Sequence, residues 1–393
     1  MKHSVSLTAT LAMMAGLSYG FPRKEEIMRR AALQKRASAE LIGDLLTLQD
    51  SQLTQTGKDI KAILLGTTRG IDTTSNYTNV PQINSPECRQ DTCCIWKHIA
   101  DDMASSMIGD AGRCNDLARG SIRLGFHDAA KWSKKTTGGG ADGSIILAGE
   151  CESRPDNDAL QPTCAQMRTW FDKYKQFNVT VTDMIQMAAN VGTVSCPMGP
   201  RVRSFVGRKD SSTESPQGLM PLGSDNADKL IALFADKTIS ADGLVALVGA
   251  HSTAQQRAFD PARSGDPLDS TPGVWDTNFY NETLEARTPQ RVFKLPSDIS
   301  LSRDNRTSAA WKRFVGSQGQ GPWDGAYSRE YVRLSLLGVN NINELTECTK
   351  VLPAFIPTFV NPDQTELSSY LANSPQPAQS ESAKLLNGSR LNG

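Results

Sequence analysis

Apolar residues recur every three to four positions through much of this chain, which is the spacing of one face of an α-helix. The clearest segments predict helices at residues 95–108, 116–129, 165–177, 182–191, 227–236, 241–251 and 307–314. Ser240 stands directly before one of them and is a suitable N-cap. Strict alternation of apolar and polar residues, which would indicate strands, is scarce. The chain is therefore expected to be mainly α-helical.

The first 85 residues follow a different pattern. Residues 1–20 combine an early lysine with a short apolar run and small residues at the end, which is typical of a secretory signal peptide. Residues 21–85 form an N-terminal extension, in which apolar residues spaced between 37 and 65 predict one or two amphipathic helices and residues 66–85 form a polar linker. The extension has two dibasic pairs, Arg29-Arg30 and Lys35-Arg36, which are typical of propeptide processing. It is therefore either a propeptide or a helix packed on the body.

The rest of the chain divides into a domain at residues 86–367 and a tail at residues 368–393, whose Ser, Pro, Asn and Gln content predicts disorder. The 393 residues balance 42 basic with 42 acidic side chains, so their charge does not favour a nucleic-acid partner. No apolar stretch has the length of a membrane span. Five glycosylation sequons agree with a secreted, extracellular protein: Asn76, Asn178, Asn281, Asn305 and Asn387.

All eight cysteines lie beyond the expected signal peptide. An even number of cysteines in a secreted chain predicts disulfides rather than catalytic thiols or a zinc site. Their spacing alone does not give the connectivity. The eight are Cys88, Cys93, Cys94, Cys114, Cys151, Cys164, Cys196 and Cys348.

The candidate chemistry centres on Arg123 and His127, in the sequence Arg-Leu-Gly-Phe-His-Asp. At i and i+4 they share one helical face, which places a permanent cation beside a group that takes up and returns a proton near neutral pH. Such a pair suits heterolysis of an O–O bond. His251, in Leu-Val-Gly-Ala-His-Ser, would complete the site by holding a haem iron. A lone histidine is more often an ordinary core or surface residue, but this chain has only four.

These segments resemble the distal and proximal histidine regions of the plant, fungal and bacterial haem peroxidase superfamily. The order of motifs from about Cys88 to Thr365 is similar to the secreted fungal branch, class II, which includes lignin, manganese and generic peroxidases. The resemblance implies a two-lobed helical fold with one haem b between a distal and a proximal lobe. It also implies that His127 is the general base and acid and that Arg123 stabilises charge on the departing oxygen.

Further roles are implied by the same resemblance. Phe126 would pack over the haem, and the Asn157 carbonyl would keep His127 neutral. His251 would bind the haem iron, and Asp298 would accept a hydrogen bond from its other ring nitrogen. Two calcium ions would be bound through hard oxygen ligands, one by Asp128, Gly140, Asp142 and Ser144, the other by Ser252, Asp269, Thr271, Val274 and Asp276. Without the resemblance, both segments would be ordinary turns.

The family pattern also implies a disulfide connectivity. It pairs Cys88 with Cys94, Cys93 with Cys348, and Cys114 with Cys196, which leaves Cys151 and Cys164 to pair with each other. The family's further C-terminal bridge is not expected, because Ala309 stands where one of its cysteines would be.

The specialised electron routes of the family are not expected here. The three acidic manganese ligands correspond to Asp116, Gly120 and Arg257, and the exposed tryptophan of lignin peroxidases corresponds to Ala246. Leu268 replaces the usual proximal aromatic residue. Another surface aromatic could relay electrons instead, namely Trp132, Trp170 or Tyr174, although such residues more often serve in packing.

The resulting hypothesis is a monomeric secreted peroxidase that reduces hydrogen peroxide via compound I and oxidises small phenolic or aromatic donors. Two alternatives stay open. One is a peroxidase-fold haem-binding surface protein with little turnover, and the other is a manganese-oxidising peroxidase with unrecognised ligands.

Overall fold

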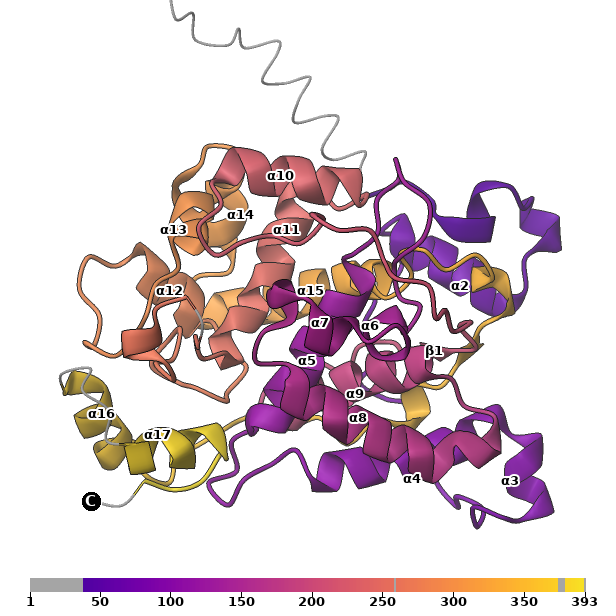
Figure 1. Cartoon of the computed structure of the whole chain (residues 1–393), viewed down its shortest axis with the longest axis horizontal. Helices are drawn as coiled ribbons and strands as arrows, with labels where there is room; N and C mark the ends of the chain where they lie inside the picture. Colours follow the sequence, from indigo (N-terminus) through magenta and orange to yellow (C-terminus); the bar gives the residue numbers. More distant parts are fainter. Residues whose placement is uncertain (1–37, 258, 374–378, 392–393) are drawn as a thin grey trace, which may run out of the picture.

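A computed structural model describes residues 38–257, 259–373 and 379–391 of the chain. The expected signal peptide and the dibasic pairs lie outside these residues. Helices make up most of the described regular structure (Figure 1), and the mainly α fold is confirmed. The described strands are β1 (Phe205–Val206) and β2 (Thr346–Glu347), which pair antiparallel with Phe205 opposite Glu347. No helix in this part of the chain has both the length and the apolar character needed to cross a bilayer.

The distal lobe is built on two long helices, α5 (Asp116–Ala129) and α9 (Val181–Ser195). Every residue of α9 is buried, and the two helices approach closely because small residues line their contact. A Cβ on Gly192 would lie 2.6 Å from the Ala118 carbonyl oxygen, and one on Gly125 would lie 2.7 Å from the Ala189 Cβ. The surrounding helices are α3 (Pro86–Gln90), α4 (Thr92–Ser105), α6 (Ser144–Leu147), α7 (Glu150–Ser153) and α8 (Gln161–Tyr174).

The proximal lobe surrounds α11 (Ala241–Val248), which Ser240 caps as predicted by accepting a hydrogen bond from Gly243 N. The α-helix ends earlier than predicted and continues as a 3₁₀ turn, η5 (Gly249–Thr253). Gly249 lies against Tyr280 and Trp323, where a Cβ would be 2.2 Å from the tyrosine oxygen. The neighbouring helices are α10 (Ala227–Asp236), α12 (Asn278–Leu284), α13 (Pro296–Arg303), α14 (Ser308–Arg313) and η6 (Pro261–Arg263).

Helix α15 (Gln320–Leu334) packs on α11 and sends Tyr327, Tyr331 and Leu334 to the space between the lobes. The sequence analysis missed this helix because its first half contains Gly321, Pro322 and Gly325, which are poor helix formers. Tertiary packing overrides that propensity, since Trp323, Tyr327 and Tyr331 are almost fully buried.

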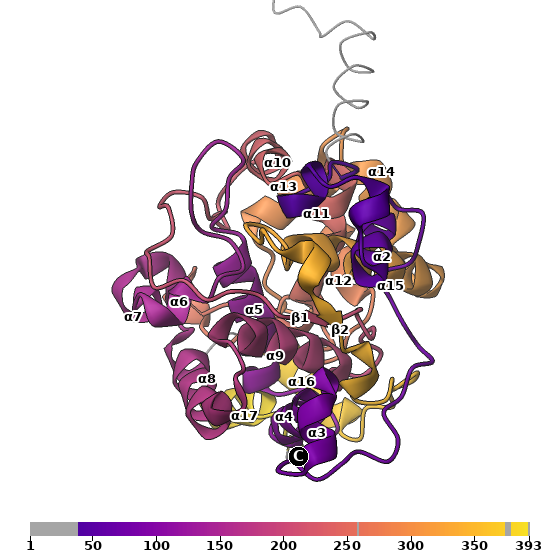
Figure 2. The ribbon, with the colours of Figure 1, turned by 90° about the vertical axis from the view of Figure 1, so that its right-hand side faces the viewer.

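Residues 38–65 pack on the body rather than standing apart from it. They contain η1 (Gly43–Leu46), η2 (Asp50–Gln52) and α2 (Gln55–Leu64), and α2 lies beside α15 (Figure 2). The Asp44 carboxylate accepts hydrogen bonds from the backbone N–H groups of Ile342, at 2.9 Å, and Asn343, at 3.1 Å. A helix of the extension therefore packs on the body in this segment.

The C-terminal segment differs from the disordered tail predicted from residue 368. It carries α16 (Gln364–Ala372) and α17 (Gln379–Leu386), which share a small apolar core. Arg113 fixes the segment by a buried bidentate ion pair with Asp363. The polar composition concealed a few apolar residues at helical spacing: Leu367, Tyr370, Leu371 and Leu385.

Four disulfides are formed with the connectivity that the resemblance implied, including the bond between Cys151 and Cys164. The bond between Cys93 and Cys348 joins residues 255 positions apart and thereby connects the start of the domain to its end.

Candidate active site

A cavity of about 530 Å³ separates the two lobes, and His127 and His251 both line it. This volume falls in the range of about 300–1,000 Å³ that is usual for ligand and cofactor sites. Its walls are largely apolar, with polar groups gathered at a few points. Apolar lining residues come from both lobes and include Phe126, Phe234, Leu244, Leu247, Leu268 and Leu334.

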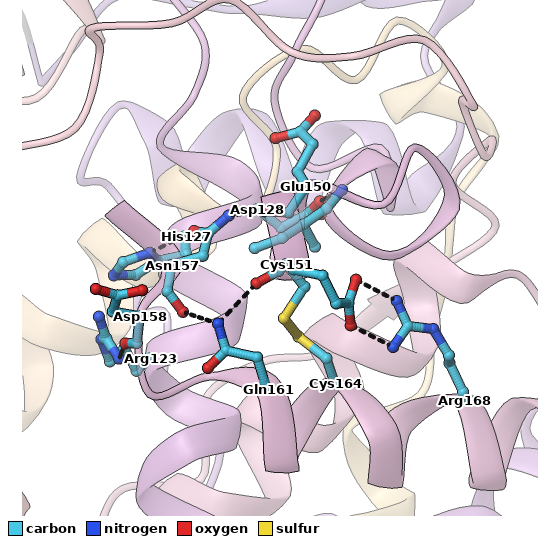
Figure 3. Close-up of a disulfide and its surroundings, with 12 residues drawn as sticks. Arg123, His127, Asp128, Glu150, Cys151, Asn157, Asp158, Gln161, Cys164 and Arg168 are labelled. Atoms are coloured by element: carbon cyan, nitrogen blue, oxygen red, sulfur yellow. Dashed lines mark hydrogen bonds and ion pairs between the residues drawn. A yellow bond between two sulfur atoms is a disulfide. The ribbon is translucent and has the colours of Figure 1, made fainter. Parts of the chain in front are cut away.

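The distal side chains come from α5, whose bounds match the predicted helix, and Asn115 caps it by accepting from Ala118 N at 3.2 Å. Arg123 and His127 face the cavity together (Figure 3). His127 Nδ1 lies 3.0 Å from Asn157 Oδ1, while Asn157 Nδ2 donates to the Glu150 carbonyl oxygen at 2.8 Å. That second bond fixes the orientation of the amide, so its oxygen must accept from Nδ1–H. The other ring nitrogen, Nε2, is left free to accept a proton.

Electrostatics keep His127 neutral. Burial lowers the pKa of His127 well below its usual 6.5, and the positive charge of Arg123 lowers it further. Burial, together with Arg257, also lowers the pKa of Arg123 to about 10, so this side chain remains charged at neutral pH. Arg123 Nη1 donates to the Asp158 carbonyl oxygen at 2.7 Å. The neutral base His127 therefore lies beside the positively charged Arg123, whose position is fixed by the Asp158 carbonyl oxygen.

Phe126 is half-buried at the wall of the cavity. Its ring stacks on Phe234 at 6.2 Å and meets the His127 ring edge-on at 5.7 Å. It thus restricts the space next to His127.

The proximal histidine has a different partner. His251 Nδ1 lies 3.0 Å from Asp298 Oδ2, in the first turn of α13. The Asp298 side chain is only 2% exposed, whereas 34% of the His251 side chain is accessible. The Phe279 ring packs edge-on against the imidazole at 5.6 Å. Because Nδ1 is engaged by the carboxylate, Nε2 is the nitrogen available to a ligand in the cavity.

The residues predicted to form the first calcium site come together directly behind His127. Asp128 accepts from Gly143 N at 3.1 Å, and Asp142 accepts from Ser144 N at 3.0 Å. Burial raises the pKa of Asp128 well above its usual value, and the charge of Asp142 raises it further. Gly140 has a φ of 111°, a conformation that favours glycine. A buried and a half-buried carboxylate that repel each other suit a divalent cation.

The second predicted calcium cluster also assembles. Ser252 Oγ donates to Asp269 Oδ2 at 2.8 Å and lies 3.3 Å from the Val274 carbonyl oxygen, and Thr271 Oγ1 lies 3.3 Å from Asp269 Oδ1. Burial raises the pKa of Asp276 to about 6, and burial together with the charge of Asp276 raises the pKa of Asp269 well above its usual value. Glu282, which the sequence analysis did not single out, adds a third nearby negative charge.

At the rim of the cavity, Arg257 forms a direct ion pair with Asp116. A cation therefore occupies the position where the resemblance would place a manganese ligand. Gly120, the third corresponding position, faces Thr163, whose Oγ1 would be 2.2 Å from an added Cβ. Trp170 and Tyr174, named as surface relays, are 3% and 5% exposed and serve as packing residues.

The sequence analysis missed two residues that support the distal part of the site. Asp158 contacts Arg123 through its backbone carbonyl, so its side chain gave no signal in the sequence. Glu150 is fully buried, and its carboxylate contacts Lys131 and Ser215, while its carbonyl orients Asn157. Burial opposes ionisation of Glu150, but the hydrogen bonds from Ser215 and Lys131 outweigh it and the pKa is lowered.

Comparisons with known proteins agree with this geometry. The family model described as Peroxidase matches residues 100–317. The chain is 34% identical over 289 residues to a peroxidase of Arthromyces ramosus, a match that covers 67% of this chain and 77% of the relative. It is 32% identical over 296 residues to a low-redox potential peroxidase of Taiwanofungus camphoratus, covering 71% and 80%. It is also 32% identical over 283 residues to manganese peroxidase 3 of Phlebia radiata, covering 66% and 76%.

Proposed function

Because the chain belongs to the peroxidase family and is a haem-dependent oxidoreductase that acts on hydrogen peroxide, we propose that it is a peroxidase of the generic type, in which His127 and Arg123 carry the peroxide step. The observation that carries this proposal is the contrast between the two cavity histidines. One has a neutral amide partner and a lowered pKa, and the other has a buried carboxylate partner.

The cavity fits a haem group. It has the volume and apolar walls of a cofactor site, and His251 Nε2 is the nitrogen that would bind the iron. The carboxylate of Asp298 makes that nitrogen a stronger donor. When bound, haem supplies the redox chemistry of the reaction, while this chain supplies orientation, charge and proton transfer.

In the peroxide step, His127 Nε2 accepts a proton from one peroxide oxygen. It returns that proton to the other oxygen, which leaves as the O–O bond breaks. Proton transfer of this kind is typically worth about 10²–10⁴ in rate. The Arg123 guanidinium stabilises the negative charge that develops on the departing oxygen. The Asn157 hydrogen bond keeps Nε2 free for this role, and Phe126 limits what can approach it.

Two calcium ions are proposed at the clusters of Asp128 and Asp269. The support is the repulsion between carboxylates in each cluster, which a bound cation would relieve. Asp128 follows His127 and Ser252 follows His251, so each ion would hold the backbone next to one histidine.

We propose small phenolic and aromatic compounds as the donors. The support is the ion pair between Asp116 and Arg257, which neutralises the carboxylate a manganese ion would need and sets a cation against it. Ala246 is buried and cannot present a side chain for surface electron transfer. Export is proposed from the sequence of residues 1–20 and the four disulfides.

The test is rapid mixing of the haem-loaded protein with hydrogen peroxide, followed by a phenol, veratryl alcohol or Mn²⁺. We expect a fast spectral change with peroxide and a return to the resting spectrum with the phenol. A haem spectrum that does not respond to peroxide would reject the function and favour a binding protein. Turnover that depends on Mn²⁺ and survives Asp116→Ala would instead favour a manganese-oxidising enzyme.

A further inference from the structure

The disulfide between Cys151 and Cys164 closes a short loop that carries the partners of both distal catalytic groups. The two cysteines are 13 residues apart, fully buried, and join α7 to α8. Between them, Asn157 contacts His127 and Asp158 contacts Arg123 (Figure 3). One covalent bond therefore spans the base of the segment that touches both groups.

The contact with Arg123 depends on the path of the backbone. It is made by the Asp158 carbonyl oxygen, 2.7 Å from Arg123 Nη1, so only the position of the main chain determines it. The next residue, Ala159, has a φ of 66°, which is unfavourable for a residue other than glycine and persists only where surrounding structure holds it.

Noncovalent contacts also hold this loop: Asn157 Nδ2 donates to the Glu150 carbonyl oxygen at 2.8 Å, and Arg154 pairs with the Glu150 carboxylate at 3.1 Å. Gln161 Nε2 donates to the Cys151 carbonyl oxygen at 3.0 Å. Arg168 and Glu152 form a bidentate ion pair at 2.7 and 2.9 Å, but both side chains are exposed, so this pair constrains α7 and α8 less than a covalent bond does. The α7 side is held by the buried Glu150 and Lys131, whose charged groups lie 3.0 Å apart. The disulfide adds a covalent link from this fixed side to the start of α8.

We propose that the Cys151–Cys164 disulfide is a positioning element for the peroxide step, because it holds Asn157 and Asp158 where they orient His127 and Arg123. This inference rests on the proposed function of the distal site. It assigns the disulfide no part in binding haem or in oxidising the donor, since Cys151 and Cys164 do not line the cavity.

The test compares haem-loaded wild type with the double variant Cys151→Ala/Cys164→Ala. We expect the peroxide step to slow by about 10- to 100-fold, since a misplacement of about 1 Å can cost about 100-fold. Cyanide affinity of the ferric protein should fall in parallel, because hydrogen cyanide must also give its proton to a placed distal base. The haem content and the rate constant of the donor step should stay at the wild-type level.

Two matched controls isolate the effect. Cys88→Ala/Cys94→Ala removes another short disulfide, remote from the cavity lining, and Arg168→Gln removes the ion pair between α7 and α8. The first should leave the peroxide step within about twofold of wild type, because it shares no partner with the distal groups. The second should slow the peroxide step less than loss of the disulfide does, because an exposed ion pair constrains α7 and α8 less than a covalent bond. If the alanine pair does not fold, Cys151→Ala/Cys164→Val fills the buried volume without restoring the bond.

A double-mutant cycle with Asn157→Ala tests whether the disulfide acts through the loop that carries Asn157. If the disulfide acts through this loop, removing it from the Asn157→Ala protein should slow the peroxide step by less than it does in wild type. An unchanged peroxide step, or equal losses in the peroxide and donor steps, would overturn the inference and leave the disulfide a purely stabilising role. A wild-type protein that does not react with peroxide would reject the proposed function instead, and cyanide affinity would still report on the disulfide.

Discussion

The distal and proximal halves of the cavity use the same side chain in opposite ways. His127 is 7% exposed, donates to an uncharged amide and has a lowered pKa, whereas His251 is more accessible and donates to a buried carboxylate. An amide partner fixes the ring without favouring its protonated form, so the free nitrogen remains a base. A carboxylate partner makes the free nitrogen electron-rich, which suits a metal ligand. The partner, rather than the histidine itself, decides the role.

The two halves are also built differently. The distal partners come from one short loop, tied by a disulfide and by the Glu150 network. The proximal partner comes from α13, far along the chain from α11. In each half, the residue after the histidine belongs to an acidic cluster. Asp128 is part of the distal cluster, and Ser252 donates to Asp269 in the proximal one.

The largest expected effect is on the proximal side. His251→Ala removes the nitrogen that would bind iron, so the absorption band of ligated haem should disappear and all peroxidase activity with it. The measurement is the haem spectrum after reconstitution, with circular dichroism as the control for folding. A normal spectrum would show that the iron ligand lies elsewhere.

His127→Ala should impair only the peroxide step, which depends on the distal half of the cavity. The haem spectrum should remain, while the peroxide step should slow by about 10²–10⁴, the usual contribution of a positioned proton-transfer group. Rapid mixing with peroxide measures this directly. Near-normal kinetics would remove His127 from the proposed role.

Exchanging the distal partner should make the two halves alike. In wild type the lowered pKa of His127 keeps the base neutral, so the peroxide step should stay constant as the pH falls through 6.5 and decline only below that value. Asn157→Asp places a carboxylate beside Nδ1, which favours the protonated ring and raises its pKa. The decline should therefore move to higher pH. A pH profile identical to wild type would contradict the proposed part of Asn157.

Asp298→Asn is the reciprocal exchange. It keeps the hydrogen bond but removes the charge, and loss of such partners typically costs about 10–100-fold in metal affinity or activity. Haem loss to a competing acceptor protein, measured spectroscopically, should become faster. The peroxide step measured on freshly loaded protein separates this effect from the distal one.

The smallest expected effect is that of calcium on stability. Saturating calcium at about 100 times its dissociation constant should stabilise the fold by about 2.7 kcal/mol per site, which a chelator would reverse. Because the folded pKa of Asp276 is raised to about 6, the calcium-free fold takes up protons more readily than the unfolded chain and gains stability as the pH falls. Calcium must displace those protons, so its stabilisation should decline as the pH falls through about 6. Thermal unfolding at several pH values tests this.

Local signals in the sequence were sufficient to predict the bounds of two helices, one in each lobe. The bounds of 116–129 and 227–236 agree with the structure, because both segments have clear apolar periodicity and strong caps in Asn115 and Asn226. The signals failed where packing overrides propensity, as in α15 with its early glycines and proline, and where few apolar residues suffice, as in α16 and α17.

By itself, the sequence determined the helical class, the shared face of Arg123 and His127, and, through its resemblance to a known family, the pairing of all eight cysteines. The same resemblance implied that Asn157 partners His127 and that Asp298 partners His251, and the structure gives both contacts a distance of 3.0 Å. Only the tertiary structure showed that the Asp158 carbonyl oxygen meets Arg123, at 2.7 Å. Periodicity and spacing report on neighbours within one turn of a helix. Contacts between separate segments, above all those made by backbone atoms, depend on how the whole chain packs.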